Sequence, residues 1–308
     1  MATRKEVKNR ISSVKNIQKI TRAMEMVAAA RLRRAEQRID ALRPYAQAIR
    51  RLTRRASEEV GEIPRVPVLE QRENVRTVGI LLITGDRGLA GAFNTNIIRE
   101  GMRLGRDFRG DGAEISFSVV GRRGDSALTF RKEEVANAYT GFTDRPGFAN
   151  AREIAEQLTS AYVDEELDRV ELIYNRYVSP LTQYVRRQTL LPLQQAEVFG
   201  EKVEELAPDE PDFDEELVEA HRRALWIYEP EPEELLKRLA PDYVNISVYR
   251  ALLESAASEH GARMTAMRNA AENAESMIED LTLEMNRVRQ SEITQEILEV
   301  VSGAEALG

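Results

Sequence analysis

Residues 253–288, LESAASEHGARMTAMRNAAENAESMIEDLTLEMNRV, carry the strongest structural signal in the chain. Apolar or small side chains recur in it at alternating steps of four and three residues, the heptad spacing of a left-handed coiled-coil seam. No proline and only one glycine, Gly261, occur between Asp242 and Ser302, so one long helix is expected. The predicted seam is Leu253, Ala257, His260, Met264, Met267, Ala271, Ala274, Ile278, Leu281, Met285 and Val288.

The other end of the chain predicts a second long helix. Residues 1–60 contain no glycine and a single proline, Pro44. A second apolar line follows roughly the same heptad spacing. It comprises Val7, Ile11, Val14, Ile17, Thr21, Met24, Ala28, Leu32, Ala35, Ile39, Leu42, Ala46, Ile49 and Leu52.

The two end helices are expected to pair with each other. Residues 1–55 carry 16 Lys or Arg against four acids, whereas residues 251–308 carry four Arg against 11 acids. Opposite charge favours this pair over the alternative, in which each helix forms its own homodimer. If both helices join one body the pair is antiparallel, and at ~1.5 Å per residue each helix should project beyond a body ~40 Å across.

The middle of the chain predicts a small doubly wound α/β domain. Strands are expected at 78–84, 115–121, 170–178 and 184–192, and helices at 94–108 and 149–162. The fold class is therefore α/β with long helices, a long antiparallel left-handed coiled coil plus this domain. The predicted division is an N-terminal helix at 1–60, an α/β foot at 61–240 and a C-terminal helix at 241–308. The foot includes an acidic loop at 197–219, whose residues carry 11 acids against Lys202.

The residues give no support for covalent chemistry, so the chain is not expected to be an enzyme. Cysteine is absent, and His221 and His260 are the only imidazoles. His260 lies on the predicted seam, where a packed or hydrogen-bonded role is expected. The glycines of TGDRGLAGAFN are spaced G-x-x-G-x-x-G, unlike a dinucleotide fingerprint or a P-loop, which favours a tight turn over a phosphate site. The acidic string DEPDFDEE lacks the spacing of a calcium loop.

Two other function classes stay open on composition alone. The basic first helix is compatible with a nucleic-acid-binding coiled-coil protein, although Tyr45 is its only aromatic residue within 1–55 and the whole chain has a net charge of -8. The α/β body is compatible with a small nucleotide-dependent enzyme. No apolar run approaches the ~20 residues of a membrane span, and the first residues lack a secretory or transit signal. A cytosolic bacterial product is expected.

Four segments resemble the gamma subunits of F-type ATP synthases. They are IQKITRAMEMVAAARLRRAEQ at 17–37, GDRGLAGAFN at 85–94, YEPEPEELL at 228–236 and SEHGARMTAMRNAAENAESMIEDLTLEMNRVRQSEITQEILEVVSGAEAL at 258–307. The resemblance spans essentially the whole chain. It implies a non-catalytic central rotor shaft without a cofactor or metal, which couples proton flow through a c ring to ATP synthesis, or the reverse hydrolysis, at a ring of alpha and beta subunits.

The resemblance also implies partners and contact residues. The partners are three alpha and three beta subunits, an epsilon subunit and the c ring, with no nucleic acid. The chain would then be a peripheral protein on the cytoplasmic face of the bacterial inner membrane, held there only through the complex. Contacts with the alpha/beta ring, direct or supporting, fall on Met24, Arg263, Arg289, Gln290, Thr294 and Glu296. Contacts with epsilon and the c ring fall on Trp226, Tyr228 and Glu229.

The chain departs from the family pattern at a few places. Ala90 and Ala92 replace residues that are often Cys and Gly, and the acidic stretch 197–219 is longer than usual, so the alignment there is unsafe. The cysteine-bearing regulatory insert of plant plastid gamma subunits is missing. Thiol control is therefore not expected.

Overall fold

The computed structural model describes residues 3–59, 67–72, 74–193 and 232–305. Two long helices, α1 (Arg4–Glu59) and α7 (Pro232–Glu305), enclose the other elements in the sequence. The chain forms two compact units, one of Met1–Ala30 with Arg263–Gly308 and the other of Arg31–Ala262. The acidic loop 197–219 lies outside the described residues, and the division of the chain into three segments stays a prediction.

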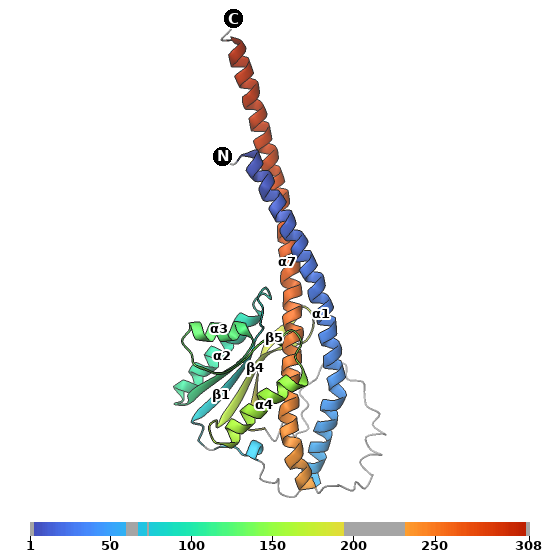
Figure 1. The fold of residues 1–308 in the computed structure, drawn as a ribbon, viewed down its shortest axis with the longest axis vertical. Helices are drawn as coiled ribbons and strands as arrows, with labels where there is room; N and C mark the ends of the chain where they lie inside the picture. Colours follow the sequence, from blue (N-terminus) through green and yellow to red (C-terminus); the bar gives the residue numbers. More distant parts are fainter. Residues whose placement is uncertain (1–2, 60–66, 73, 194–231, 306–308) are drawn as a thin grey trace. The chain divides into compact units, whose positions relative to one another are not determined.

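In the first unit α1 and α7 pair side by side in antiparallel orientation (Figure 1). Arg22 donates a hydrogen bond to Glu275 at 3.0 Å, and Arg268 donates one to Glu25 at 2.9 Å. The residue number falls along α7 as it rises along α1, which confirms the predicted direction. The left-handed winding and the projection of the helices beyond the body stay predictions.

The seams of the two helices are largely those expected. Every predicted seam residue of α7 from Leu253 to Val288 is buried or half-buried. On α1 the prediction was wrong at Ile17, which is 53% exposed, whereas Gln18 is half-buried. The strict alternation of four and three residues runs from Val14 through Gln18 to Thr21, because helix geometry, rather than the apolar character of one side chain, decides which position faces the partner.

The second unit contains a five-stranded sheet in the order β3-β2-β1-β4-β5. The first four strands in this order are parallel, and β5 pairs antiparallel with β4. The strands are β1 (Thr77–Ile83), β2 (Glu114–Val120), β3 (Val135–Tyr139), β4 (Arg169–Tyr177) and β5 (Gln183–Leu191). The prediction of a largely parallel sheet is confirmed, and the antiparallel edge strand is an addition to it.

Helices cover both faces of the sheet (Figure 1). They are α2 (Phe93–Gly110), α3 (Arg122–Phe130) and α4 (Phe148–Val163), and a short 3₁₀ turn η1 (Pro67–Leu69) precedes β1. Ile80 and Leu82 of β1 pack in one core cluster with residues of α2 and α3. Leu81 and Ile83 pack in the other, with α4 and α7. Both faces of β1 are buried, which explains why its sequence, TVGILLI, is a nearly continuous apolar run without polar alternation.

Buried tyrosines make the fold sensitive to alkaline pH. Burial, and secondarily the charge of Glu153, raise the pKa of Tyr139 to about 12 from 10.0, and its hydroxyl donates a hydrogen bond to Gln157. A pKa that is higher in the folded state favours folding below the unfolded-state pKa, and this contribution is lost as the pH rises from 10 to about 12. Burial also raises the pKa of Tyr174.

We therefore expect the midpoint of urea unfolding to fall between these two pH values. In Tyr139→Phe the decrease of the urea midpoint should be smaller, since one of the contributing hydroxyls is gone. Tyr174 should still cause part of the decrease. The same pair of proteins at neutral pH is the control for any general loss of stability. Equal pH dependence in the two proteins would contradict the assignment to Tyr139.

Candidate partner-binding helix pair

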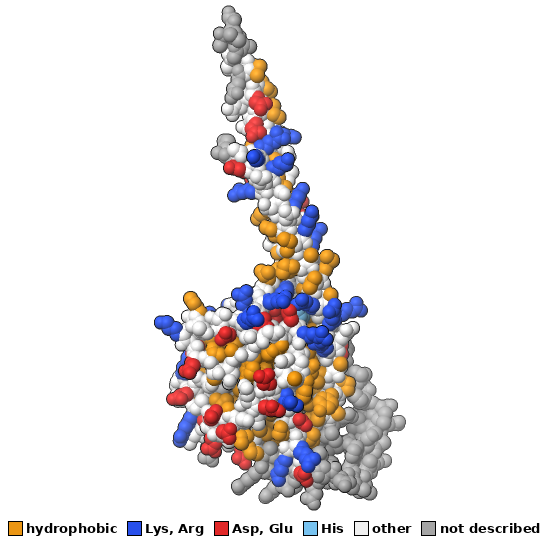
Figure 2. All heavy atoms as spheres, viewed as in Figure 1, with side chains coloured by type: hydrophobic (Ala, Val, Ile, Leu, Met, Phe, Trp, Pro, Cys, Tyr) orange, Lys and Arg blue, Asp and Glu red, His pale blue; other side chains and the backbone are white. Residues whose placement is uncertain are grey.

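The two flanks of the helix pair in the first unit differ in chemistry. One flank carries the ion pairs Arg22–Glu275 and Glu25–Arg268. At ~100° per residue, Ile17, Ile20 and Val27 lie ~140° to 160° around α1 from Arg22. Their exposed fractions are 53%, 59% and 53%. Figure 2 shows hydrophobic side chains exposed along the helix pair.

The same flank of α7 is mixed, because the exposed acids Asp280 and Glu284 lie on it, ~140° and ~180° around α7 from Glu275. Met277, which is 52% exposed, lies ~160° around α7 from Glu275, on the side that faces away from the ion pairs. One flank of the pair therefore carries the ion pairs, and the other carries exposed apolar side chains of α1 with Met277 and two acids of α7. A partner that meets this pair from different sides meets different chemistry.

The last part of α7 extends past the start of α1. The two ion pairs place Arg4, the first residue of α1, level with about residue 290 of α7. The described side chains from Ser291 to Ser302 are exposed. The large apolar ones among them are Ile293, Ile297, Leu298, Val300 and Val301. This end of α7 thus carries an apolar surface without α1 beside it.

The structure places the residues predicted to contact an alpha/beta ring in three different settings. Met24 is half-buried on α1. Arg263, on α7, is only 9% exposed. Arg289, Gln290, Thr294 and Glu296 are exposed within two turns of one another near the end of α7, where the Thr294 hydroxyl donates to the Gln290 carbonyl at 2.9 Å. The register puts Met24 level with about residue 271, so ~27 Å along the helix separates it from Arg289.

Trp226, Tyr228 and Glu229, predicted to contact epsilon and the c ring, lie outside the described residues, as does His221.

In the second unit, α7 lies across the carboxyl ends of the parallel strands. The chain winds from β1 to β2 and β3 on one side and resumes at β4 on the other, so the switch point lies between β1 and β4. In open α/β sheets a ligand usually binds in this place. Here Ser255 donates to the Ile83 carbonyl at 3.3 Å and Ser258 donates to the Asn175 carbonyl at 3.1 Å. The polar stretch of α7 therefore fills the position that a nucleotide would take in a doubly wound enzyme.

The glycine turn packs against this stretch, as the sequence predicted. A Cβ at Gly85 would lie 2.7 Å from the carboxyl carbon of Glu259, which is buried on α7. Asn94 at the start of α2 accepts a hydrogen bond from the Gly85 amide at 2.8 Å. A side chain at position 85 would therefore require the Glu259 carboxylate to move.

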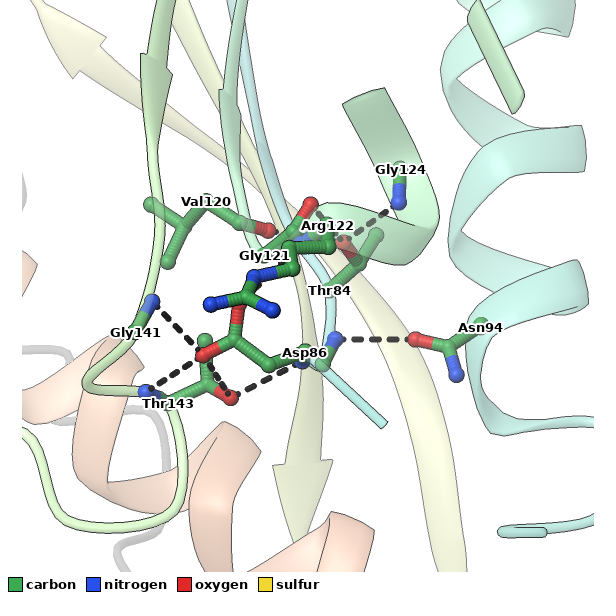
Figure 3. Close-up of polar contacts among 10 residues, drawn as sticks. Thr84, Asp86, Asn94, Val120, Gly121, Arg122, Gly124, Gly141 and Thr143 are labelled. Carbon is green, nitrogen blue, oxygen red and sulfur yellow. Dashed lines mark hydrogen bonds and ion pairs between the residues drawn. The ribbon is translucent and has the colours of Figure 1, made fainter. Parts of the chain in front are cut away.

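Asp86 ties this turn to the loops that follow β2 and β3 (Figure 3). Its Oδ2 accepts hydrogen bonds from the Gly141 amide at 2.9 Å and from the Thr143 amide and hydroxyl at 3.3 and 3.0 Å. Its Oδ1 accepts one from the Arg122 amide at 3.2 Å. Thr84 similarly donates to the Val120 carbonyl at 2.7 Å and accepts from the Gly124 amide at 3.0 Å. These bonds brace the sheet edge on which α7 lies.

We expect Asp86→Ala to lower the free energy of unfolding by about 2 to 4 kcal/mol, because it removes four hydrogen bonds and leaves the partly buried amide and hydroxyl of Thr143 without this acceptor. Urea unfolding of the full chain measures the loss. Asp107→Ala is the matched control, since that carboxylate is 58% exposed and pairs only at 3.8 Å with Arg103. Equal stability of the Asp86 and Asp107 variants would contradict the bracing role.

His260 of α7 contacts Asp144, which lies in the loop after β3. His260 is 1% exposed, and its Nε2 lies 3.3 Å from the Asp144 carbonyl oxygen, which confirms the expected packed, hydrogen-bonded role. Asp144 and the buried Ser255 and Ser258 were not singled out from the sequence. The serines interrupt the apolar run ALLESAASEH and could have been noticed there, whereas Asp144 stands in a loop without any local pattern.

The described residues contain no group of three or more His, Asp or Glu side chains placed to hold a metal ion. None of the helices in the described ranges combines the length and apolar character needed to cross a bilayer.

An antiparallel pair of long helices, one of which continues as part of an α/β core, is the architecture of a shaft-type subunit. The sequence profile of a family described as ATP synthase matches residues 3–307. The ATP synthase gamma chain of a Nostoc species is 41% identical over 319 residues, which cover 100% of both chains. The chain belongs to the ATP synthase gamma chain family and acts as the rotor subunit of the central stalk.

Solved structures agree with this assignment. A chain in the central stalk and c-ring structure of the Tetrahymena thermophila mitochondrial ATP synthase is 27% identical, with a TM-score of 0.57 over 82% of this chain and 99% of that one. A chain of the Euglena gracilis mitochondrial ATP synthase shares the fold, with a TM-score of 0.65 and 18% identity over 99% of this chain and 94% of that one. The alternative of a nucleic-acid-binding coiled coil is not supported.

Proposed function

We propose that this chain does no catalysis itself and transmits rotation between the c ring and the catalytic ring of an ATP synthase. Its partners are then three alpha and three beta subunits, an epsilon subunit and the c ring. The observation that carries the proposal is the antiparallel helix pair whose flanks differ, one with the ion pairs and the other with the exposed apolar side chains of α1. As such a pair turns, each surrounding subunit meets the two flanks in succession, so the three catalytic sites are kept out of phase.

The anchoring of α7 supports a coupling role. Its residues Val244, Val248 and Leu252 share one apolar cluster with sheet residues and with α4. The same helix continues into the pair with α1. A force on the α/β part therefore reaches the helix pair along one continuous backbone. We further propose that the protein is peripheral to the cytoplasmic face of a bacterial inner membrane and reaches the membrane only through the complex.

The exposed contact residues are proposed to act in two ways. Met24 and the group Arg289, Gln290, Thr294 and Glu296 meet alpha and beta subunits directly, since they are exposed or half-exposed on the helix pair. Arg263, which is buried, supports the helices instead. Trp226, Tyr228 and Glu229 remain proposed contacts with epsilon and the c ring.

Co-expression with bacterial alpha and beta subunits tests the assignment. The expected product is a complex with three alpha and three beta subunits per chain that hydrolyses ATP, whereas the purified chain alone does not. A photo-crosslinking residue at Arg289 should trap alpha or beta subunits in that complex. The same residue at Glu153, exposed on α4, is the control and should not. Failure to co-assemble, or ATP hydrolysis by the chain alone, would contradict the proposal.

A further inference from the structure

The two long helices join the α/β part of the second unit in different ways. For α7 the junction is apolar and buried, because Val244, Val248 and Leu252 pack with Leu172 and Tyr174 of β4. This junction is continuous with the core of the sheet. The segment of α7 next to it cannot move against the sheet without breaking that core.

α1 meets the same part of the protein through polar side chains. Arg31 donates a hydrogen bond from Nη1 to Asp144 Oδ2 at 2.6 Å. Five residues further on, Glu36 accepts a hydrogen bond from the Tyr177 hydroxyl at 2.5 Å. Asp144 belongs to the loop between β3 and α4, and Tyr177 ends β4, so the two contacts come from separate elements.

Asp144 connects several segments at once. Besides Arg31, its Oδ2 lies 3.7 Å from Nη1 of Arg87 in the glycine turn. Its main-chain carbonyl lies 3.3 Å from His260 Nε2 on α7. Its other carboxylate oxygen, Oδ1, is buried and has no hydrogen-bond partner among the described residues. The two guanidinium groups therefore stabilise the negative charge of a carboxylate that is only partly exposed.

Tyr177 forms a second contact that persists over a wide pH range. Burial, and secondarily its hydrogen bond to Glu36, raise the pKa of Tyr177 above its ordinary value. The hydroxyl therefore keeps its proton at neutral pH and continues to donate to the carboxylate of Glu36.

We propose that Asp144 is a positioning residue that locks α1 to the α/β body, with Tyr177 as a second lock, so that both helices turn with the body. This inference rests on the proposed rotary function and deepens it. Arg31 and Glu36 are ~7.5 Å apart along α1 and ~140° apart around it. Contacts at two heights and on two sides oppose sliding of α1 along its axis as well as rotation about it. Without them, the described part of α1 in this unit is held by apolar packing against α7, such as that of Ile49 with Leu239 and Ile246.

Asp144→Asn is the most direct variant, because it keeps the size of the side chain and removes the charge that pairs with Arg31. Asp40→Asn is the matched control, since Asp40 is an exposed acid on α1 that pairs with Arg43 within the same helix. Tyr177→Phe removes only the hydroxyl that contacts Glu36. Because Arg31 and Asp144 are about a third exposed, we expect each lock to change the population of detached α1 by about fivefold at most.

Distances between spin labels in the assembled complex measure the lock itself. The chain has no cysteine, so cysteines introduced at Gln37 on α1 and Glu153 on α4, both exposed, are its only labelling sites. Cysteines of the other subunits are replaced beforehand. The parent should give one narrow distance distribution, and so should Asp40→Asn. Asp144→Asn should add a second, broader component, which grows further in the double variant with Tyr177→Phe.

Proton pumping per ATP hydrolysed, measured in inverted membrane vesicles, gives the functional readout. We expect it to fall in Asp144→Asn and more in the double variant, while ATP hydrolysis and the amount of assembled complex stay as in the parent. An unchanged distance distribution in the double variant would overturn the lock, and a broadened distribution with unchanged pumping would overturn its role in coupling. Failure of the parent chain to assemble would instead refute the proposed function.

Discussion

Ala274→Pro is expected to uncouple ATP hydrolysis from proton pumping in the assembled complex. Ala274 is 6% exposed on the seam of α7 in the first unit. Proline there removes one backbone hydrogen bond, clashes with the preceding turn and costs a helix about 3 kcal/mol or more. The resulting kink separates the seams of α1 and α7. Inverted vesicles should therefore retain ATP hydrolysis but lose most ATP-driven acidification.

Proline near the free end of the same helix is the control. Ser302 is exposed and lies in the last turn of α7, which ends at Glu305. Few helical hydrogen bonds follow it, so Ser302→Pro should keep pumping close to the parent value. If Ala274→Pro pumped as well as Ser302→Pro, a stiff, continuous α7 would not be needed for coupling.

Gly121→Ala is expected to cause the largest loss of stability among single-methyl additions. Gly121 precedes α3 with φ 93° and ψ 137°, a conformation that residues with a side chain rarely adopt. An added Cβ would also lie 2.4 Å from the Thr84 carbonyl oxygen, which is backbone and is held by the sheet edge. The loss in free energy of unfolding should reach about 3 kcal/mol or more.

Gly112→Ala separates the cost of a positive φ from the cost of crowding against a neighbouring atom. Gly112 also has a positive φ, 88°, but a Cβ there would meet nothing within 4 Å. Its loss should stay near about 1 kcal/mol, the cost of the unusual backbone conformation alone. Urea unfolding of both variants gives the comparison. Equal losses would show that crowding against Thr84 contributes nothing.

The sequence predicted the helix pair and most of the sheet because their signals are local and repetitive. The seam of α7 follows helix geometry over many turns, and β1 is a continuous apolar run. The short elements α3 and β3 were missed. Gly124 interrupts α3, and Ala136, Asn137 and Ala138 of β3 are exposed. Such a strand exists because it pairs with β2, not because of its own residues.

The candidate sites divide in the same way. The turn at residues 85–94 could be identified from its glycines, whereas its neighbour, Glu259 of α7, is known only from the structure. The connection between Arg31 and Asp144 spans 113 positions of sequence and joins two ordinary charged residues. Only the tertiary fold brings them together, so no spacing in the sequence indicates that contact. The sequence likewise failed to predict the exposure of Ile17, because the position of α1 that faces α7 at this level is Gln18.

Distances between spin labels in the assembled complex test the antiparallel helix pair most directly. Ala23, Ser12, Asn273 and Glu284 are exposed and suit labelling. The register places Ala23 level with Asn273, and Ser12 level with Glu284. Both matched pairs should give short, narrow distances, and Ser12 with Asn273 should be longer because of an axial offset of ~16 Å. A mismatched pair as close as the matched ones, or broad distributions for the matched pairs, would contradict a shaft made from the two ends of one chain.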